Sequence, residues 1–361
     1  MPSKQHFLLG FLLSCVLAQF MGLTFGNTIP PLVFDADLSE YVYKPGTTLR
    51  YHSEGWGTTQ VGPHGLKGQG AFSAKRDLSV VFWGDSFVEA LQVDDEEKLD
   101  ASFNRHAHKA GLPYKSLCVG RFADSIADYY FKIPVYSKAL WDKPLHVIVL
   151  GTIGDTIPGE QVACRSIFQR DGNNFAFQQR ECPPRESSLR LRNFLYEYRL
   201  NFLQTLYSRT ADNSLRLLPS NGTRAAADQQ STLLSTPPGD YDRAWDYLLE
   251  RMAAVTSGRV LFIYSPGVPS VANVNGSGII SFNNPETAHV TRFAQRCQLN
   301  GIKLIDMTKP FAEHFREHKK FPCGFNNTLP GRGHLNPVGI SLIAKELVRH
   351  LSADESQAKR P

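Results

Sequence analysis

The sequence has little net charge and no dense run of basic residues. Its 39 Lys and Arg residues stand against 34 Asp and Glu residues, which gives a formal net charge of +5 over 361 residues. Because nucleic acids are bound through concentrated positive charge, we expect no nucleic-acid partner. No internal repeat is evident, and no pattern implies a metal ion or another cofactor. The hydrophobic content of 42% excludes a disordered chain and is enough for a packed core.

Cysteine is also scarce, and the six cysteines match no zinc-binding spacing. Cys15 lies in an apolar N-terminal stretch, and Cys118 is left over from the pairing that we consider. The other four are disulfide candidates in an oxidising compartment: Cys164, Cys182, Cys297 and Cys323. Pairing of near neighbours, Cys164 with Cys182 and Cys297 with Cys323, is the simplest of the three connectivities that four cysteines allow.

Residues 7–25 lack charged side chains altogether, and this apolar stretch follows Lys4. Its 19 residues exceed the roughly 7–15 residues of a cleavable signal core and approach the about 20 residues that span a bilayer. We therefore predict a signal or anchor segment over residues 1–26, with retention as an anchor slightly favoured over cleavage. The alternative is a buried N-terminal core helix. Export would place the protein in the periplasm or outside the cell, with or without membrane anchorage.

The rest of the chain alternates between apolar runs and helical patterns. The apolar runs predict buried parallel strands at residues 79–83, 115–119, 145–150, 259–264 and 302–306. Helical patterns cover residues 94–110, 124–139, 241–256, 285–300 and 337–351. This alternation predicts a three-layer α/β/α sandwich around a mainly parallel sheet of about five strands.

Composition divides the chain into further parts. Residues 27–76 are rich in turn formers and predict an extended lead-in, and residues 77–352 predict the α/β domain. An insertion is expected at about 155–240, and a disordered tail at 353–361. Within the insertion, residues 194–203 carry aromatic and leucine side chains at helical spacing, which indicates a core-facing helix rather than a ligand platform.

A serine and a distant histidine are the best candidates for chemistry. Ser86 stands in Gly-Asp-Ser-Phe at residues 84–87, directly after the predicted strand at 79–83. His334 stands in Gly-His-Leu-Asn-Pro at residues 333–337, just before a predicted helix. A serine on a strand-to-helix turn lies at the carboxyl edge of a parallel sheet, where a histidine can act as its base.

Both motifs resemble blocks of the SGNH/GDSL hydrolase superfamily, which comprises serine esterases and acyltransferases with a flavodoxin-like sheet. The resemblance extends over residues 43–351 and implies that Ser86 is the nucleophile and that His334 is general base and then general acid. It implies that Asp85 supports the turn by accepting backbone hydrogen bonds. Gly120 follows the second predicted strand, where the family has an oxyanion-hole glycine, so its N–H would act together with that of Ser86.

The sequence departs from the family pattern at two places. Gly331 stands three residues before the histidine, where the family has an orienting aspartate. Another carboxylate or a backbone carbonyl must therefore orient His334, or activity is low. In the block after the third strand, alignment on Asp155 leaves Gly154 where relatives carry an oxyanion asparagine. Gly154 could offer only its main-chain N–H to the oxyanion hole.

Export and the resemblance together predict an exported serine esterase or O-acyltransferase. The expected substrates are ester groups, above all O-acetyl groups, on cell-surface polysaccharide or lipid, and transfer would involve a membrane-embedded acyl-transfer partner. The sequence does not distinguish hydrolysis from transfer. The alternative is a weak or inactive relative that binds glycan or lipid within a membrane-associated assembly. A third hypothesis is an exported α/β protein whose motif matches are accidental. A wide separation between Ser86 and His334 in the structure would support this hypothesis.

Overall fold

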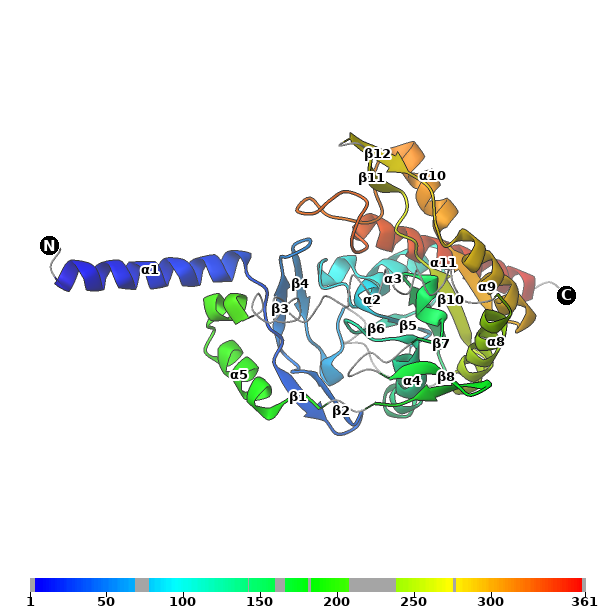
Figure 1. Cartoon of the computed structure of the whole chain (residues 1–361), viewed down its shortest axis with the longest axis horizontal. Helices are drawn as coiled ribbons and strands as arrows, with labels where there is room; N and C mark the ends of the chain where they lie inside the picture. The colour runs from blue at the N-terminus through cyan, green and yellow to red at the C-terminus, as the bar shows by residue number, and fades with distance from the viewer. Residues whose placement is uncertain are drawn as a thin grey trace.

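A parallel five-stranded sheet forms the centre of the computed structural model (Figure 1). The structure describes residues 4–68, 78–141, 143–159, 166–180, 183–207, 238–274 and 277–358. The sheet strands are β5 (Val80–Gly84), β6 (Ser116–Gly120), β7 (Leu145–Leu150), β10 (Val260–Tyr264) and β13 (Lys303–Asp306). They follow one another in space as β13-β10-β7-β5-β6, with every pair parallel. Numbered along the chain, this is the flavodoxin-like order 2-1-3-4-5, which confirms the predicted fold class.

Helices cover both faces of the sheet. One face is covered by α4 (Ile126–Leu140), α8 (Pro238–Val255) and α9 (Thr287–Leu299), and the other by α2 (Ser86–Glu89), α3 (Leu99–Lys109), α10 (Thr308–His318) and α11 (Pro337–Ala358). Successive strand residues point to opposite faces, so Trp83 packs in the first core and Phe82 in the second. Two buried cores therefore fix the sheet whose carboxyl edge carries Ser86.

The lead-in folds as two short antiparallel hairpins. The first joins β1 (Leu32–Asp35) to β2 (Glu40–Tyr43), and the second joins β3 (Thr48–Tyr51) to β4 (Gly57–Gln60). The predicted insertion contributes the β8 (Ile167–Asp171)–β9 (Asn174–Gln178) hairpin and helix α5 (Glu186–Glu197). The remaining elements are η1 (Pro63–Gly65), η4 (Asp95–Glu97), η5 (Ile153–Thr156) and the hairpin of β11 (Ser270–Val274) with β12 (Ser277–Ser281).

Helix α1 (Lys4–Phe25) projects from the body of the molecule (Figure 1). It is long and apolar enough to cross a membrane, and nearly all of its apolar side chains are exposed. The alternative of a buried N-terminal core helix is therefore wrong. At the other end of the chain, α11 continues through Ala358, where we had expected a disordered tail from residue 353.

Two further expectations fail for geometric reasons. Cys297 and Cys323 are free thiols, because Cys297 packs in the core on one face of the sheet and Cys323 in the core on the other. The proposed pairing of Cys164 with Cys182 lies outside the described residues. The aromatic stretch at 194–203 is helical, but only Leu195 is buried as an apolar side chain, whereas Phe194 and Tyr198 face outward. Its helical spacing reflects an exposed apolar face rather than core.

Candidate active site

Ser86 begins the single helical turn α2, directly after the central strand β5. Asp85 caps this turn, and its Oδ1 accepts a hydrogen bond from Phe87 N at 2.9 Å. A Cβ on Gly84 would lie 2.3 Å from the Val88 side chain, so only glycine allows α2 to fold back so closely on the strand. Burial raises the pKa of Asp85. The turn therefore presents the Ser86 side chain, which is half-buried, at the carboxyl edge of the sheet.

His334 meets Ser86 from the loop between α10 and α11. The Ser86 Oγ lies 2.8 Å from His334 Nε2, which is hydrogen-bonding distance for a hydroxyl that donates to an imidazole. The structure thus brings together the two residues that the motifs singled out, although 248 positions separate them. The reading in which both motif matches are accidental is therefore disfavoured.

Glu54, in the loop between β3 and β4, supplies the carboxylate that the sequence comparison had missed. Its Oε2 accepts a hydrogen bond from His334 Nδ1 at 2.5 Å, and its Oε1 accepts one from His334 N at 2.7 Å. Both carboxylate oxygens therefore hold the same histidine, one through its ring and one through its backbone. This arrangement leaves Nε2 unprotonated and directed at Ser86, as a general base requires.

The loop before His334 explains why the acid comes from elsewhere. Gly331 has φ +73°, and a Cβ there would lie 2.7 Å from the Phe321 ring and 2.9 Å from Pro269 O. An aspartate at this position has neither the backbone conformation nor the space that it needs. Gly333 has φ +88°, and its Cβ would lie 2.2 Å from Glu54 Oε1, so a side chain there would displace the carboxylate.

The electrostatics of Glu54 favour its ionised form. Burial by itself would raise its pKa, but the hydrogen bonds and the charge of His334 outweigh burial and hold the pKa of Glu54 below its usual value. A carboxylate that stays ionised can stabilise the imidazolium that forms when His334 accepts a proton. In the sequence, the only signal was an acidic residue in a turn of the lead-in, followed by Gly55.

The two glycines expected near the oxyanion differ in the structure. Gly120 ends β6 opposite Gly84, and a Cβ there would lie 2.2 Å from Glu89 N, so it permits close packing of α2 on β6. This packing places its backbone beside the turn that carries Ser86. The N–H of Gly154, in contrast, donates to Thr152 Oγ1 at 3.1 Å. That donor is used within its own loop, so we do not retain Gly154 among the oxyanion donors.

A hydrogen-bond network fixes the loop that departs from the family pattern. Glu286 accepts hydrogen bonds from Thr152 Oγ1 at 2.5 Å, from Ile153 N at 3.2 Å and from Tyr264 OH at 2.7 Å. Ile153 itself is fully buried. The network ties the ends of β7 and β10 together and gives this loop a structural function, which the sequence alone did not reveal.

Comparisons with known proteins found only slight likenesses to solved structures. No protein-family model and no curated protein sequence matches the chain. An acetyl xylan esterase, AlAXEase, is 15% identical, with a TM-score of 0.38 over 76% of this chain and 99% of its own. TesA is 12% identical, with a TM-score of 0.34 over 75% of this chain and 96% of its own. AlinE4, an SGNH-hydrolase family esterase, is 12% identical, with a TM-score of 0.33 over 80% of this chain and 98% of its own.

These likenesses are slight, so the assignment of the fold rests on features of the chain itself. The strand order is flavodoxin-like, and the serine and histidine blocks meet at the carboxyl edge of the sheet. The fold is flavodoxin-like, as the resemblance to the SGNH/GDSL superfamily implied. Glu54 is the feature in which this site departs most from the pattern that the resemblance implied.

Buried charges support the helical turn that carries the serine. Glu89, at the end of α2, pairs with Lys67 Nζ at 2.9 Å and accepts a hydrogen bond from Phe122 N at 2.8 Å. Burial would raise the pKa of Glu89, but Lys67 holds it below its usual value. Lys98, which is fully buried, donates to Glu89 O at 3.0 Å and to Ala90 O at 2.5 Å. These contacts satisfy the carbonyls at the end of α2 and fix its position.

A small pocket with both apolar and charged lining adjoins the carboxyl end of β6, beside Gly120 and Arg121. Across it, Lys132 Nζ lies 2.7 Å from Asp124 and 3.4 Å from Glu40. The charged groups on this wall are paired with one another.

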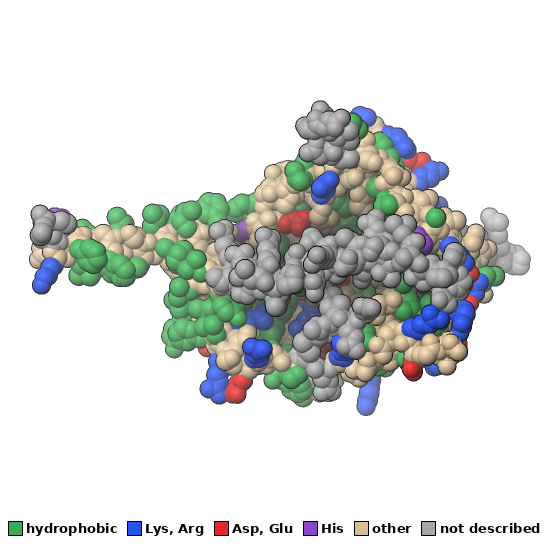
Figure 2. All heavy atoms as spheres, viewed as in Figure 1, with side chains coloured by type: hydrophobic (Ala, Val, Ile, Leu, Met, Phe, Trp, Pro, Cys, Tyr) green, Lys and Arg blue, Asp and Glu red, His purple; other side chains and the backbone are tan. Residues whose placement is uncertain are grey.

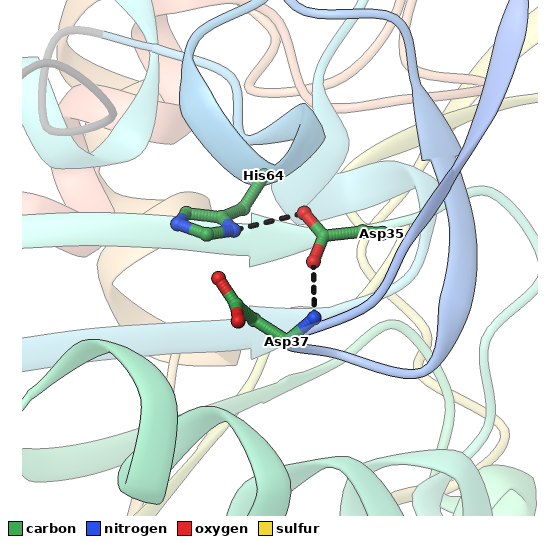
Figure 3. Close-up of side chains that lie close together, drawn as sticks. All are labelled: Asp35, Asp37 and His64. Atoms are coloured by element: carbon green, nitrogen blue, oxygen red, sulfur yellow. Dashed lines mark hydrogen bonds and ion pairs between the residues drawn. The ribbon is translucent and has the colours of Figure 1, made fainter.

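A cluster of Asp35, Asp37 and His64 lies in the lead-in (Figure 3). Their ligand atoms are close enough for a metal ion, but the Asp35 carboxylate already has partners. Its Oδ2 lies 2.8 Å from His64 Nδ1, and its Oδ1 accepts hydrogen bonds from Asp37 N at 3.0 Å and Leu38 N at 3.1 Å. These contacts give the cluster a structural role, because they join the β1–β2 turn to η1.

Proposed function

We propose that this protein is an exported serine esterase or O-acyltransferase that uses Ser86, His334 and Glu54 as a catalytic triad. The observation that carries the proposal is the continuous chain of hydrogen bonds from Ser86 Oγ through the His334 ring to Glu54. Three side chains from three distant parts of the sequence converge in the order that a serine nucleophile requires. A site that only bound ligand would have no need of this order.

The geometry supports a two-step acyl transfer. Ser86 Oγ attacks the ester carbonyl while His334 Nε2 takes the hydroxyl proton, and the imidazolium then gives that proton to the departing alcohol. Water or an acceptor hydroxyl next attacks the acyl-enzyme, and His334 again accepts and returns the proton. The N–H groups of Ser86 and Gly120 would hold the oxyanion in both steps. Glu54 keeps the imidazole in one tautomer and stabilises its charged form.

The proposed substrate is an O-acetyl or similar ester on a cell-surface polysaccharide or lipid. The arrangement of Ser86, His334 and Glu54 supports ester chemistry, and the substrate class is taken from the resemblance of the two motifs to the SGNH/GDSL superfamily. Transfer rather than hydrolysis would draw the acyl group from a membrane-embedded partner, and helix α1 supports placement at a membrane outside the cytoplasm. The engaged N–H of Gly154 favours the second candidate, a weak or inactive glycan- or lipid-binding relative.

Labelling of the purified full chain with a fluorophosphonate, together with release of p-nitrophenol from its acetate ester, tests the proposal. We expect labelling and turnover in the wild type and in Ser341→Ala, and neither in Ser86→Ala. Ser341 is a matched control because its Oγ lies 3.0 Å from His106 Nε2, which makes a second serine–histidine pair outside the site. Equal labelling of the wild type and Ser86→Ala would exclude Ser86 as the nucleophile. Silence in all three proteins would favour the binding role or an enzyme that needs its own acyl donor.

A further inference from the structure

The segment from α5 through residue 207 carries an exposed apolar face. Leu191, Phe194 and Tyr198 recur at helical spacing along one side, and Phe202 and Leu203 extend the face into a second helical stretch at residues 201–207. Phe194 is 49% exposed, Tyr198 67% and Leu203 46%. A helix on the surface of a soluble domain normally turns polar side chains outward, so this face is inverted. We call these five residues the apolar platform.

The opposite side of this segment is anchored on the lead-in. Asn193 Oδ1 accepts a hydrogen bond from Leu32 N at 3.1 Å, and the hydroxyl of Tyr196 accepts one from Thr48 N at 3.3 Å. Gln204 is buried, and its Oε1 accepts a hydrogen bond from Ile29 N at 3.2 Å. These three side chains therefore face the protein, and rotation of the helix to bury the platform would break their contacts.

Helix α1 packs directly on the same segment. Gln19, a polar residue within the apolar run, donates to Arg199 O and accepts a hydrogen bond from Phe202 N at 3.2 Å. A Cβ on Gly22 would lie 2.5 Å from Phe202 N, so the two backbones are in close contact. Small residues at backbone contacts and satisfied polar side chains are typical of helix packing in membranes. Figure 2 shows hydrophobic side chains continuing from α1 onto the surface beside its C-terminal end.

We propose that the apolar platform is a membrane-docking surface, which inserts into the interfacial region of the same bilayer that α1 enters. Gln19 lies six residues before the end of α1, or about 9 Å along its axis. Phe202, which contacts Gln19, therefore lies about 9 Å inside the end of the spanning helix, within the depth of about 5–10 Å at which interfacial helices bury their apolar face. Trp56, whose ring lies 6.1 Å from that of Phe25, adds an aromatic residue at the end of the spanning helix, where the membrane interface would lie.

Docking would hold the proposed active site close to the membrane surface. Trp56 lies two residues from Glu54, in the same loop between β3 and β4. The surface that we propose does not depend on the serine chemistry, because no platform residue contacts Ser86, His334 or Glu54 among the described contacts. A failure of one proposal therefore leaves the other standing.

Tryptophan quenching by brominated lipids tests the docking surface in the full chain, reconstituted into vesicles of phosphatidylcholine with phosphatidylglycerol. One variant, Leu203→Trp, reports on the platform, and another, Leu13→Trp, reports on the middle of α1. The matched control is Leu299→Trp, because Leu299 is 73% exposed at the end of α9, on the far side of the molecule from α1 (Figure 1). Emission of the parent protein, with its four natural tryptophans, is subtracted from each.

We expect the tryptophan at 203 to be quenched at least about twofold more by bromines near the glycerol than by bromines near the chain ends. The tryptophan at 13 should show the reverse order, and that at 299 no quenching. Quenching at position 13 without quenching at position 203 overturns the proposal. If the membrane-bound protein is then found to be a dimer, the apolar platform would be assigned to contact with a second copy of the chain. No quenching at either position overturns it as well. A far-ultraviolet circular dichroism spectrum that matches the parent verifies that each variant is folded.

Discussion

Ser86 lies at the edge of a buried sheet, whereas Glu54 lies in a surface loop of the lead-in. Almost fully buried groups fix the turn that carries Ser86. Lys67 bonds to the side chain of Glu89 at the end of this turn, and Lys98 bonds to its backbone carbonyl. Among the described residues, no buried charged group contacts the loop that carries Glu54. Asparagine side chains near the surface hold this loop instead. The two halves of the proposed triad therefore depend on different forces.

Two asparagines from opposite ends of the chain hold the acid loop, by which we mean residues 52–56 around Glu54. Asn27 Oδ1, just after α1, accepts hydrogen bonds from His52 N at 2.7 Å and Ser53 N at 3.2 Å. Asn327 Oδ1 accepts one from Gly55 N at 2.8 Å, and Asn327 Nδ2 donates to His52 O at 3.1 Å. Because these bonds lie near the surface, their loss should affect catalysis more than folding. Damage to the buried charges should affect folding first.

Substitution of Glu54 should have the largest effect on catalysis. Glu54→Gln should lower kcat for p-nitrophenyl acetate by about 10⁴ with little loss of folded protein, because an amide cannot accept from both N–H groups of His334. Steady-state kinetics and circular dichroism measure the two quantities. Glu96→Gln, an exposed substitution of the same kind, is the control. An unchanged kcat for Glu54→Gln would remove Glu54 from the triad.

Breaking the buried ion pair under the nucleophile should give the largest loss of stability. Lys67→Met leaves Glu89 charged and buried without its partner, which should cost about 3–5 kcal/mol in the free energy of unfolding. Lys303→Met breaks an exposed pair with Asp354 and should cost less than about 1 kcal/mol. Urea unfolding of both variants measures the difference. Equal costs would show that burial of the pair is not what matters.

The same contrast explains which parts could be predicted from the sequence. The five strands were predictable because continuous apolar runs are required of strands buried on both faces, and Ser86 and His334 stood in recognisable local motifs. Glu54 was not predictable, because its contact with His334 spans 280 positions and depends on how the lead-in hairpin lies on the domain. The aromatic stretch at 194–203 was misjudged because periodicity shows that a helix has an apolar face, but not what covers that face.

The contact between Gly333 and Glu54 allows a test of whether catalysis depends on the position of the Glu54 carboxylate. Gly333→Ala would place a Cβ against Glu54 Oε1, and displacement of a catalytic group by about 1 Å can cost about 10² in rate. Gly258→Ala is the matched control, because Gly258 also has a positive φ, of 75°, but has open space around its Cβ. Both variants carry the same kind of backbone strain, so kcat should fall only in Gly333→Ala. A similar fall in both would attribute the effect to strain.

The pH dependence of stability should reveal the ionised state of Glu54. The folded-state pKa of Glu54 lies below its usual value, so its contribution is fully present above the unfolded pKa of about 4.3 and is lost as pH falls through the folded pKa. The difference in unfolding free energy between wild type and Glu54→Gln should therefore be constant near neutral pH and shrink in acid. Urea unfolding at a series of pH values measures it. A difference that grows in acid would contradict a lowered pKa.

The smallest effect should come from the amide that holds the acid loop. Asn327→Ala removes bonds to Gly55 and His52 on both sides of Glu54, and the loss of about 1 kcal/mol of positioning should lower kcat roughly fivefold, whereas Asn326→Ala should not. Asn327 touches no reacting atom, so its effect must pass through Glu54. In the Glu54→Gln background, Asn327→Ala should then cost nothing further, and kinetics of the double variant measure this coupling. Additive losses would mean that Asn327 acts on the site by another route than the position of the acid.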